Sequence, residues 1–308
     1  EAHLDGPLPI HGWAEIGLGM IDHERGRLDI ARQYVERGLA RGKAGGIGDL
    51  ILRGYARLTQ IHLALGDVER AQDYAQQMLV YVQPVNMPMT MRWARALEAR
   101  IWLAKGELDR VREWAEAITL DPAPLTFVYQ FEYLTYLRAL MAQGDTKHVL
   151  SLIDQRLKII GEHLLTEVEL RTLKALALAQ LGEQHNALAL LKQALSLAEG
   201  CGLVRIFLDE GASLHFLLGR LKDVHPYAQT LLGETIVHLP EGLTEALTER
   251  EMTILQAIAD GASNAEIAES LVISVATVKK HISNLFLKLN VSNRTQAVAR
   301  AREWQILP

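Results

Sequence analysis

The sequence predicts an all-α protein, in which a solenoid of stacked helical hairpins precedes a compact four-helix unit. Glycines recur every 38 to 40 residues between apolar helical patterns over roughly the first 200 positions. Sustained alternation of β-branched and polar residues, the signature of strands, is nearly absent. The last 60 or so residues follow a different pattern, with short helices and side-chain caps.

The repeats are marked by five glycines, each followed five positions later by a small or β-branched residue. These pairs are Gly26/Ala31, Gly66/Ala71, Gly106/Val111, Gly144/Val149 and Gly182/Ala187. A fixed period of this length indicates an internal repeat, and each period has room for a helix, a tight turn and an antiparallel helix. Such hairpins cannot bury their apolar faces alone, so we expect them to stack.

The repeat is similar to a tetratricopeptide repeat, although it is longer than the usual period of about 34 residues. We therefore expect a tetratricopeptide-like solenoid with lengthened helices over residues 1–237, a linker over 238–243 and a separate domain over 244–308. Pro240 and Gly242 disfavour a continuous helix through the linker. We expect most tryptophans and tyrosines of the repeats to fill hairpin cores, with the lining of a ligand cavity as the alternative.

Four short helical patterns follow the linker, and capping residues stand at their starts. The expected caps are Thr248 with Glu251, Ser263 with Glu266, Ser274 without a Glu partner, and Ser292 or Asn293. Gly261 supplies the chain reversal after the first of these helices, because a residue without Cβ adopts positive φ readily.

The third of these helices has two contrasting faces. Its apolar stripe comprises Val275, Val278, Ile282, Leu285 and Leu289. The opposite face carries Ala276, Lys280, Ser283, Asn284 and Leu287, with Lys279 at its flank. A helix that lies in the major groove of DNA needs such a face, because small side chains permit close approach while Lys and Asn reach base edges or phosphates.

The segment resembles the C-terminal DNA-binding domain of the LuxR family. The shared pattern reads Leu247-Thr248-x-Arg250-Glu251, Gly261-x-Ser263-Asn264-x-Glu266-Ile267-Ala268, Ser274-x-x-Thr277-Val278-Lys279-x-His281, Lys288-Leu289-x-Val291 and Arg294-x-x-Ala297. The resemblance implies that Lys279, Lys280 and Ser283 face the major groove of double-stranded DNA. It also implies that Thr277 and Lys288 contact phosphates. Asn290 stands where the family often has Gly, and we expect Asn to tolerate the left-handed turn.

The last helix, from Asn293 to Trp304, carries a small apolar patch formed by Ala297, Val298 and Ala301. We expect this patch to pair two copies of the chain on a palindromic site, with little or no dimer in free solution. In the alternative, the patch packs inward against the first helix of the domain.

A repeat region joined to a LuxR-type C-terminus resembles the MalT-like large ATP-binding regulators. The resemblance implies that the chain, which starts at Glu1, is a fragment without the N-terminal ATPase, and that its repeats sense a small effector or a protein partner. We find no Gly-x-x-x-x-Gly-Lys motif, no metal-ligand spacing and no catalytic motif, so we expect no cofactor, no metal and no enzymatic activity.

The single cysteine, Cys201, excludes a disulfide within the chain and indicates a reducing, cytoplasmic location. We expect it to be a small packed hydrophobe. No apolar run is long enough to span a membrane. Two hypotheses remain: a regulator whose repeats bind an effector, or a repeat scaffold that docks a protein or peptide, with DNA binding secondary. A deep, mostly apolar pocket would favour the first, and a broad open groove the second.

Overall fold

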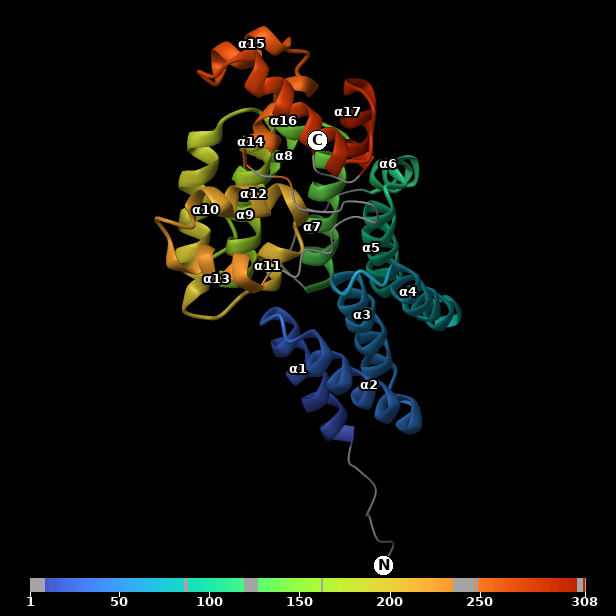
Figure 1. The fold of residues 1–308 in the computed structure, drawn as a ribbon. Coiled ribbons are helices and arrows are strands. Elements are labelled where there is room, and N and C mark those ends of the chain that lie inside the picture. Colours follow the sequence, from blue (N-terminus) through green and yellow to red (C-terminus); the bar gives the residue numbers. More distant parts are fainter. Residues whose placement is uncertain are drawn as a thin grey trace, which may run out of the picture. The chain divides into compact units, whose positions relative to one another are not determined.

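The computed structural model describes residues 9–85, 88–118, 127–161, 163–234, 247, 249–303 and 307. Within these residues the regular structure is helical and no strand occurs, which confirms the predicted all-α class (Figure 1). The chain forms two compact units, residues 1–209 and 210–308, and each is described by itself. The predicted linker 238–243 lies outside the described residues, so the boundaries at 237 and 244 stay a prediction.

The first unit contains five helical hairpins in succession. They are α1 (Pro9–Glu24) with α2 (Leu28–Gly45), α3 (Gly48–Ala64) with α4 (Val68–Val82), α5 (Pro88–Lys105) with α6 (Leu108–Glu116), α7 (Phe127–Ala142) with α8 (Thr146–Leu157), and α9 (Leu164–Gln180) with α10 (Gln184–Glu199). A 3-10 turn, η1 (Gln83–Val85), follows α4, and a short helix, α11 (Arg205–Leu208), ends the unit.

The five repeat glycines make the turns inside these hairpins, and all of them have positive φ, between 71° and 81°. At Gly66 the N–H donates to the carbonyl of Leu63 at 3.0 Å, and the N–H of Asp67 donates to that of His62 at 2.9 Å. The other four turns repeat this pair of bonds. It is the Schellman arrangement, which satisfies the last carbonyls of the first helix and requires a left-handed residue.

The small residue five positions after each glycine lies at the hairpin contact. Ala31, Ala71, Val111, Val149 and Ala187 are all 0% exposed. Each stands in the first turn of the second helix, where the two helices of the hairpin are closest after the tight turn. A larger side chain there would force them apart, because protein cores are close-packed. The repeat pattern of the sequence therefore reflects the geometry of one recurring turn.

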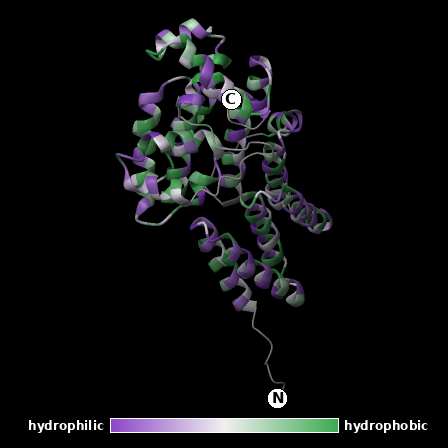
Figure 2. Cartoon of the chain, in the orientation of Figure 1, coloured by the Kyte–Doolittle hydropathy of each residue, from purple (hydrophilic) through white to green (hydrophobic). Residues whose placement is uncertain are grey.

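Stacking of successive hairpins buries the apolar faces, as predicted. One cluster joins side chains from α2, α3, α4 and α5, among them Val35, Leu58, Met78 and Leu97. Figure 2 shows hydrophobic and hydrophilic residues alternating along the helices. Trp93 and Trp114 are buried in such clusters, as expected of core-filling aromatics.

The first unit also makes a contact between its two ends. The N–H of Val204, just before α11, donates to the carbonyl of Glu24 at the end of α1, at 2.8 Å. The carboxylate of Glu24 accepts bonds from His23 Nδ1 at 3.3 Å and from Arg57 of α3 at 3.5 Å. Burial alone would raise the pKa of Glu24, but the His23 hydrogen bond and the charges of Arg57 and Arg205 outweigh burial and lower it. A buried ionic cluster thus joins the first two hairpins to α11.

One expectation about the first unit is wrong. Cys201 is exposed, because it stands in the turn after α10 and not on a packed helix face. No helix in the described residues is long and apolar enough to cross a membrane.

The second unit begins with α12 (Gly211–Leu221) and α13 (Pro226–Glu234). Then come α14 (Glu249–Ala259), α15 (Asn264–Ser270), α16 (Val275–Lys288) and α17 (Arg294–Glu303), the four helices predicted for the final segment. Their buried apolar residues form one core, against which Ala212 of α12 also packs. Helix α12, which lies within the predicted repeat range 1–237, therefore packs against the core of the C-terminal helices.

Candidate nucleic-acid interface

The helix-turn-helix is formed by α15, a turn at residues 271–274, and α16, and its caps follow the sequence prediction. Ser263 and Glu266 form the predicted capping box: the Glu266 N–H donates to Ser263 Oγ at 3.3 Å, and the Ser263 N–H donates to Glu266 Oε2 at 2.7 Å. The hydrogen bond from the Ser263 backbone N–H also lowers the pKa of Glu266. This carboxylate therefore stays ionised to a lower pH than an ordinary Glu and keeps accepting the capping bond. Ser274 caps α16 by accepting the Thr277 N–H at 3.1 Å.

Ser292 and Asn293, the two alternative caps predicted for the last helix, both take part in capping α17. Asn293 accepts the Gln296 N–H at 2.9 Å, and the Gln296 side chain in turn accepts the N–H of Ser292 at 3.0 Å. The predicted pair of Thr248 with Glu251 lies partly outside the described residues, because Thr248 is not among them. Its partner Glu251 is buried and binds Lys288 Nζ at 2.9 Å.

Three residues with left-handed backbone shape the turns between α14 and α17. Gly261 has φ of +84° and Asn290 has φ of +51°, which confirms both expectations. Val272, in the turn before α16, has φ of +52°, and nothing in the sequence pattern indicated it. A β-branched residue is strained in this conformation. Its side chain is 89% exposed, so no packing within the described residues compensates for the strain.

We predict that replacing Val272 by Asn stabilises the second unit by about 0.5–1 kcal/mol, because Asn adopts left-handed dihedrals at lower cost. Thermal unfolding of the full chain, followed by calorimetry, measures the change. The control is Val275→Asn, which changes an exposed valine outside the left-handed turn and should not stabilise the unit. An unchanged or lower unfolding temperature for Val272→Asn would contradict the strain interpretation.

The apolar stripe of α16 faces the core of the unit. Val278, Ile282, Leu285 and Leu289 are buried there. Val275, predicted to belong to the same stripe, is instead 41% exposed, because it is the first residue of the helix and projects beyond the core.

The opposite face of α16 is open to solvent. Ala276, Lys279, Lys280, Ser283, Asn284 and Leu287 are all exposed there. Lys279 and Lys280 take part in no hydrogen bond or ion pair within the part of the chain that the structure describes. Leu287 is 78% exposed and extends this face toward the end of the helix. An exposed face with two ammonium groups that have no partner within the described residues therefore lies along α16.

The other basic residues of the segment are occupied. Lys288 binds Glu251, Arg294 donates to the carbonyl of Ala262 at 2.7 Å, and Arg300 lies 3.1 Å from Glu303. The Thr277 hydroxyl lies 2.8 Å from that of Ser274. The phosphate contacts suggested for Thr277 and Lys288 stay predictions, and both groups already have a partner within the unit.

Two arginines hold the turns in place, a role that the sequence pattern did not assign. Arg250 of α14 donates to the carbonyl of Leu271 at 2.9 Å, at the end of α15. Arg294 of α17 also hydrogen-bonds the side chain of Asn264, at the start of α15. Both are positioning residues, because they fix the ends of α15 and thereby the turn that leads into α16. The sequence signal that could have indicated this role is that both arginines belong to the LuxR-type pattern.

The predicted pairing patch on α17 is not a surface. Ala297 and Ala301 are fully buried in the core of the unit, and Val298 is half-buried against it. The helical spacing correctly placed the three residues on one face, but that face packs against α14 and its neighbours. Pairing of two copies through α17 stays a prediction, and it would use the exposed residues of that helix.

Comparison with known proteins agrees with this architecture. Residues 1–224 match the family described as the MalT-like TPR region, and residues 245–301 match the luxR family of bacterial regulatory proteins. The HTH-type transcriptional regulator MalT of Vibrio cholerae is 27% identical over 313 residues, which cover 90% of this chain and 34% of that protein. The Vibrio parahaemolyticus protein of the same name is 25% identical and covers 81% of this chain and 31% of its own length.

A second kind of relative matches the C-terminal unit alone. The response regulator protein VraR of Staphylococcus aureus is 52% identical over 65 residues, which are 21% of this chain and 31% of that protein. The chain thus spans about a third of the length of the MalT proteins that it matches. With the repeat match over more than half of its length and the helix-turn-helix match at its end, the chain belongs to the family with a MalT-like TPR region and ends in a luxR-type domain.

Proposed function

We propose that the chain binds double-stranded DNA with sequence selectivity through α16 and regulates transcription, with no enzymatic activity of its own. The observation that carries this proposal is the exposed face of α16, where Lys279 and Lys280 have no partner within the described residues. The core packs against the opposite side of the helix, so this face is free to enter a groove. The names of the relatives, which are those of regulators, support the same function.

The geometry suggests a division of roles on α16. Lys280 points away from the core, with Ser283 and Asn284 to either side of it, and all three would contact base edges. Lys279 lies at the flank and would contact a base or a phosphate. The short side chains of Ala276 and Ser283 would allow the helix to approach the bases closely.

Replacing Lys280 by Ala should weaken binding to a selected duplex by about 1–3 kcal/mol and relax selectivity at one base pair. The unit should stay folded, because Lys280 is exposed and makes no contact that stabilises the core. A duplex is first selected from a random library with the parent chain, and fluorescence anisotropy then compares the variants at constant salt.

The matched control is Lys222→Ala, which removes an exposed lysine from the same unit outside the helix-turn-helix. This variant should bind like the parent apart from a small salt-dependent change. Equal binding by the Lys280 variant and the control would mean that α16 does not lie in the groove.

We also propose that the repeat unit controls DNA binding in response to an effector or a partner, in the cytoplasm. The support is the joining of a hairpin solenoid to a luxR-type domain within one chain. The second candidate, a scaffold that docks a peptide, is favoured by one observation: the groove on the repeat unit is open and has a charged rim.

A further inference from the structure

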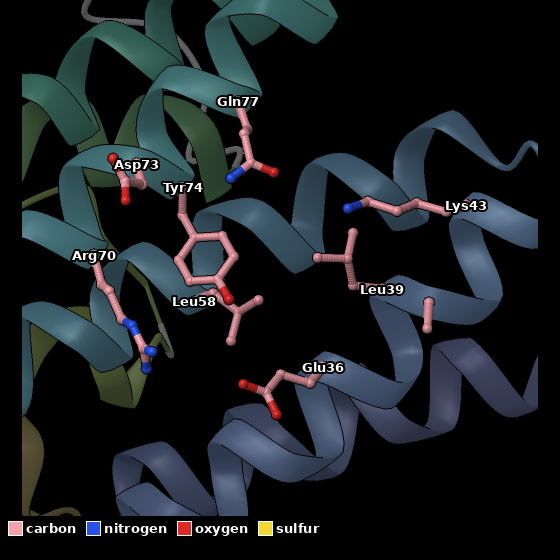
Figure 3. A pocket seen from close by; sticks show the side chains of 9 residues that line it. Glu36, Leu39, Lys43, Leu58, Arg70, Asp73, Tyr74 and Gln77 are labelled. Carbon is pink, nitrogen blue, oxygen red and sulfur yellow. The ribbon is translucent and has the colours of Figure 1, made fainter.

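A groove lies on the first unit between α2 and α4 (Figure 3). Its volume is about 490 Å³, within the range of about 300–1,000 Å³ that is typical of small-ligand sites. Leu39 of α2 and Leu58 of α3, both buried, form an apolar floor. The rim is polar and is supplied by α2 and α4. The groove is therefore amphipathic, with a hydrophobic bottom and charged edges.

Tyr74 stands in the middle of the groove, and its ring is held by aromatic neighbours. Its centroid lies 5.4 Å from that of buried His62 and 6.5 Å from that of Tyr55. Burial raises the pKa of Tyr74, and the nearby Glu36 carboxylate raises it further. The phenol therefore stays protonated at neutral pH and presents both a ring face and a hydrogen-bond donor.

The charges on the rim do not neutralise one another. Within the described residues, the side chains of Glu36, Asp73 and Gln77 make no hydrogen bond or ion pair. Among the residues that the structure describes, the contact of the Lys43 ammonium is with the Tyr55 ring, 4.9 Å from its centroid. Arg70 lies 3.9 Å from Asp67, outside the groove, so its charge is partly compensated. Two carboxylates and one ammonium are left for a ligand.

These charges are separated along the groove. Figure 3 shows Glu36 and Arg70 toward one end, Lys43 and Gln77 toward the other, and the Tyr74 ring between them. Glu36 and Lys43 are seven positions apart on α2, which is about 10 Å along the helix axis. An extended peptide advances about 3.3–3.6 Å per residue, so about three residues match this separation.

We propose that this groove binds a short peptide of about three residues with both termini free. Its N-terminal ammonium pairs with Glu36, and its C-terminal carboxylate pairs with Lys43 and Gln77. Its apolar central side chain lies on Leu39, Leu58 and Tyr74. A ligand with both charges gains a charged contact at each end of the groove, whereas a neutral or singly charged ligand lacks at least one of these contacts. A role of this peptide as the effector rests on the proposed function, whereas its recognition depends on the groove alone.

The test is calorimetric titration of the full chain with Ala-Leu-Ala, its N-acetylated form and its C-terminal amide. We expect the free tripeptide to bind and each blocked form to bind about tenfold or more weakly, because each block removes a charged contact. Lys43→Gln should weaken binding of the free peptide but not of the amide, and Glu36→Gln should weaken binding of the free peptide but not of the acetylated form. If these residues had a merely structural role, each variant would weaken binding of the free and the blocked peptides alike.

The matched controls are Glu69→Gln on α4 and Lys147→Gln on α8, which remove the same charges from exposed positions outside the groove. Both should leave the titration unchanged. The proposal is overturned if the free tripeptide does not bind at millimolar concentration or if blocked and free forms bind equally. It is also overturned if only a longer, doubly blocked peptide with Lys and Glu side chains binds, since the groove would then take a protein segment.

The titration contains no DNA, so it separates this proposal from the function of the second unit. Fluorescence anisotropy with a selected duplex, measured with and without Ala-Leu-Ala, then tests whether the peptide controls DNA binding. Peptide binding without a change in DNA affinity would keep the site and overturn its effector role. Failure of DNA binding with intact peptide binding would count against the proposed function alone.

Discussion

Replacing Arg57 by Ala should lower the free energy of unfolding of the first unit by about 3–5 kcal/mol. Arg57 is buried on α3 and faces the carboxylate of Glu24, which is also largely enclosed. Burial lowers the pKa of Arg57, and the charges of Glu24 and Asp209 oppose that shift. Removing the guanidinium leaves the largely enclosed Glu24 carboxylate without one of its cationic partners, which is the costly way to break a buried pair. Calorimetric unfolding of the full chain measures the loss.

The matched control is Arg112→Ala on α6. Arg112 pairs with Asp109 at 3.6 Å, but both side chains are exposed, so its loss should change stability by at most about 1 kcal/mol. Removing both partners, in Glu24→Gln with Arg57→Met, should cost less than Arg57→Ala because no charge is left unpaired. If Arg57→Ala behaves like the control, the cluster does not hold the ends of the unit together.

The same cluster determines in which direction the stability of the first unit changes with pH. The folded-state pKa of Glu24 is depressed below its ordinary value of 4.5. The stability contributed by this carboxylate is therefore present above that value and is lost as the pH falls through the folded pKa. The stability difference between the parent and Glu24→Gln should shrink as the pH drops below about 4.5.

Replacing Lys288 by Ala should destabilise the second unit by about 3 kcal/mol and should abolish DNA binding through unfolding. The Lys288 ammonium lies 2.9 Å from Glu251, and the two side chains are only 16% and 5% exposed. Truncation leaves the buried carboxylate of Glu251 without this cation. We take the lower end of the range for buried pairs because part of Lys288 reaches solvent.

This result would differ from that of a phosphate contact in two measurable ways. A lost phosphate contact leaves the fold intact and lowers the slope of log affinity against log salt by about one. A lost internal ion pair lowers the unfolding temperature, and Glu251→Ala should produce the same loss. Calorimetry of both variants beside Lys280→Ala, which should keep the parental stability, decides between the roles. A stable Lys288→Ala unit with a reduced salt slope would restore the phosphate role.

Much of the fold could be predicted because its signals are local. A left-handed glycine such as Gly66 and a small residue such as Ala71 stand within one turn of the same hairpin, so the sequence records their relation directly. The caps at Ser263, Ser274 and Asn293 likewise involve residues three positions apart. Helical periodicity also predicted that Lys279 and Lys280 face away from the buried stripe of α16.

The tertiary structure decided which partners meet across long stretches of chain. Glu24, Arg57 and Val204 are distant in sequence, and only the stacking of five hairpins brings them together. Periodicity showed that Ala297 and Ala301 share a face, but not that the core covers it. The same holds for Lys288, whose charge was visible in the sequence and whose partner Glu251 was not. A sequence pattern fixes the direction of a side chain on its own helix, whereas burial and pairing depend on what the rest of the chain places opposite it.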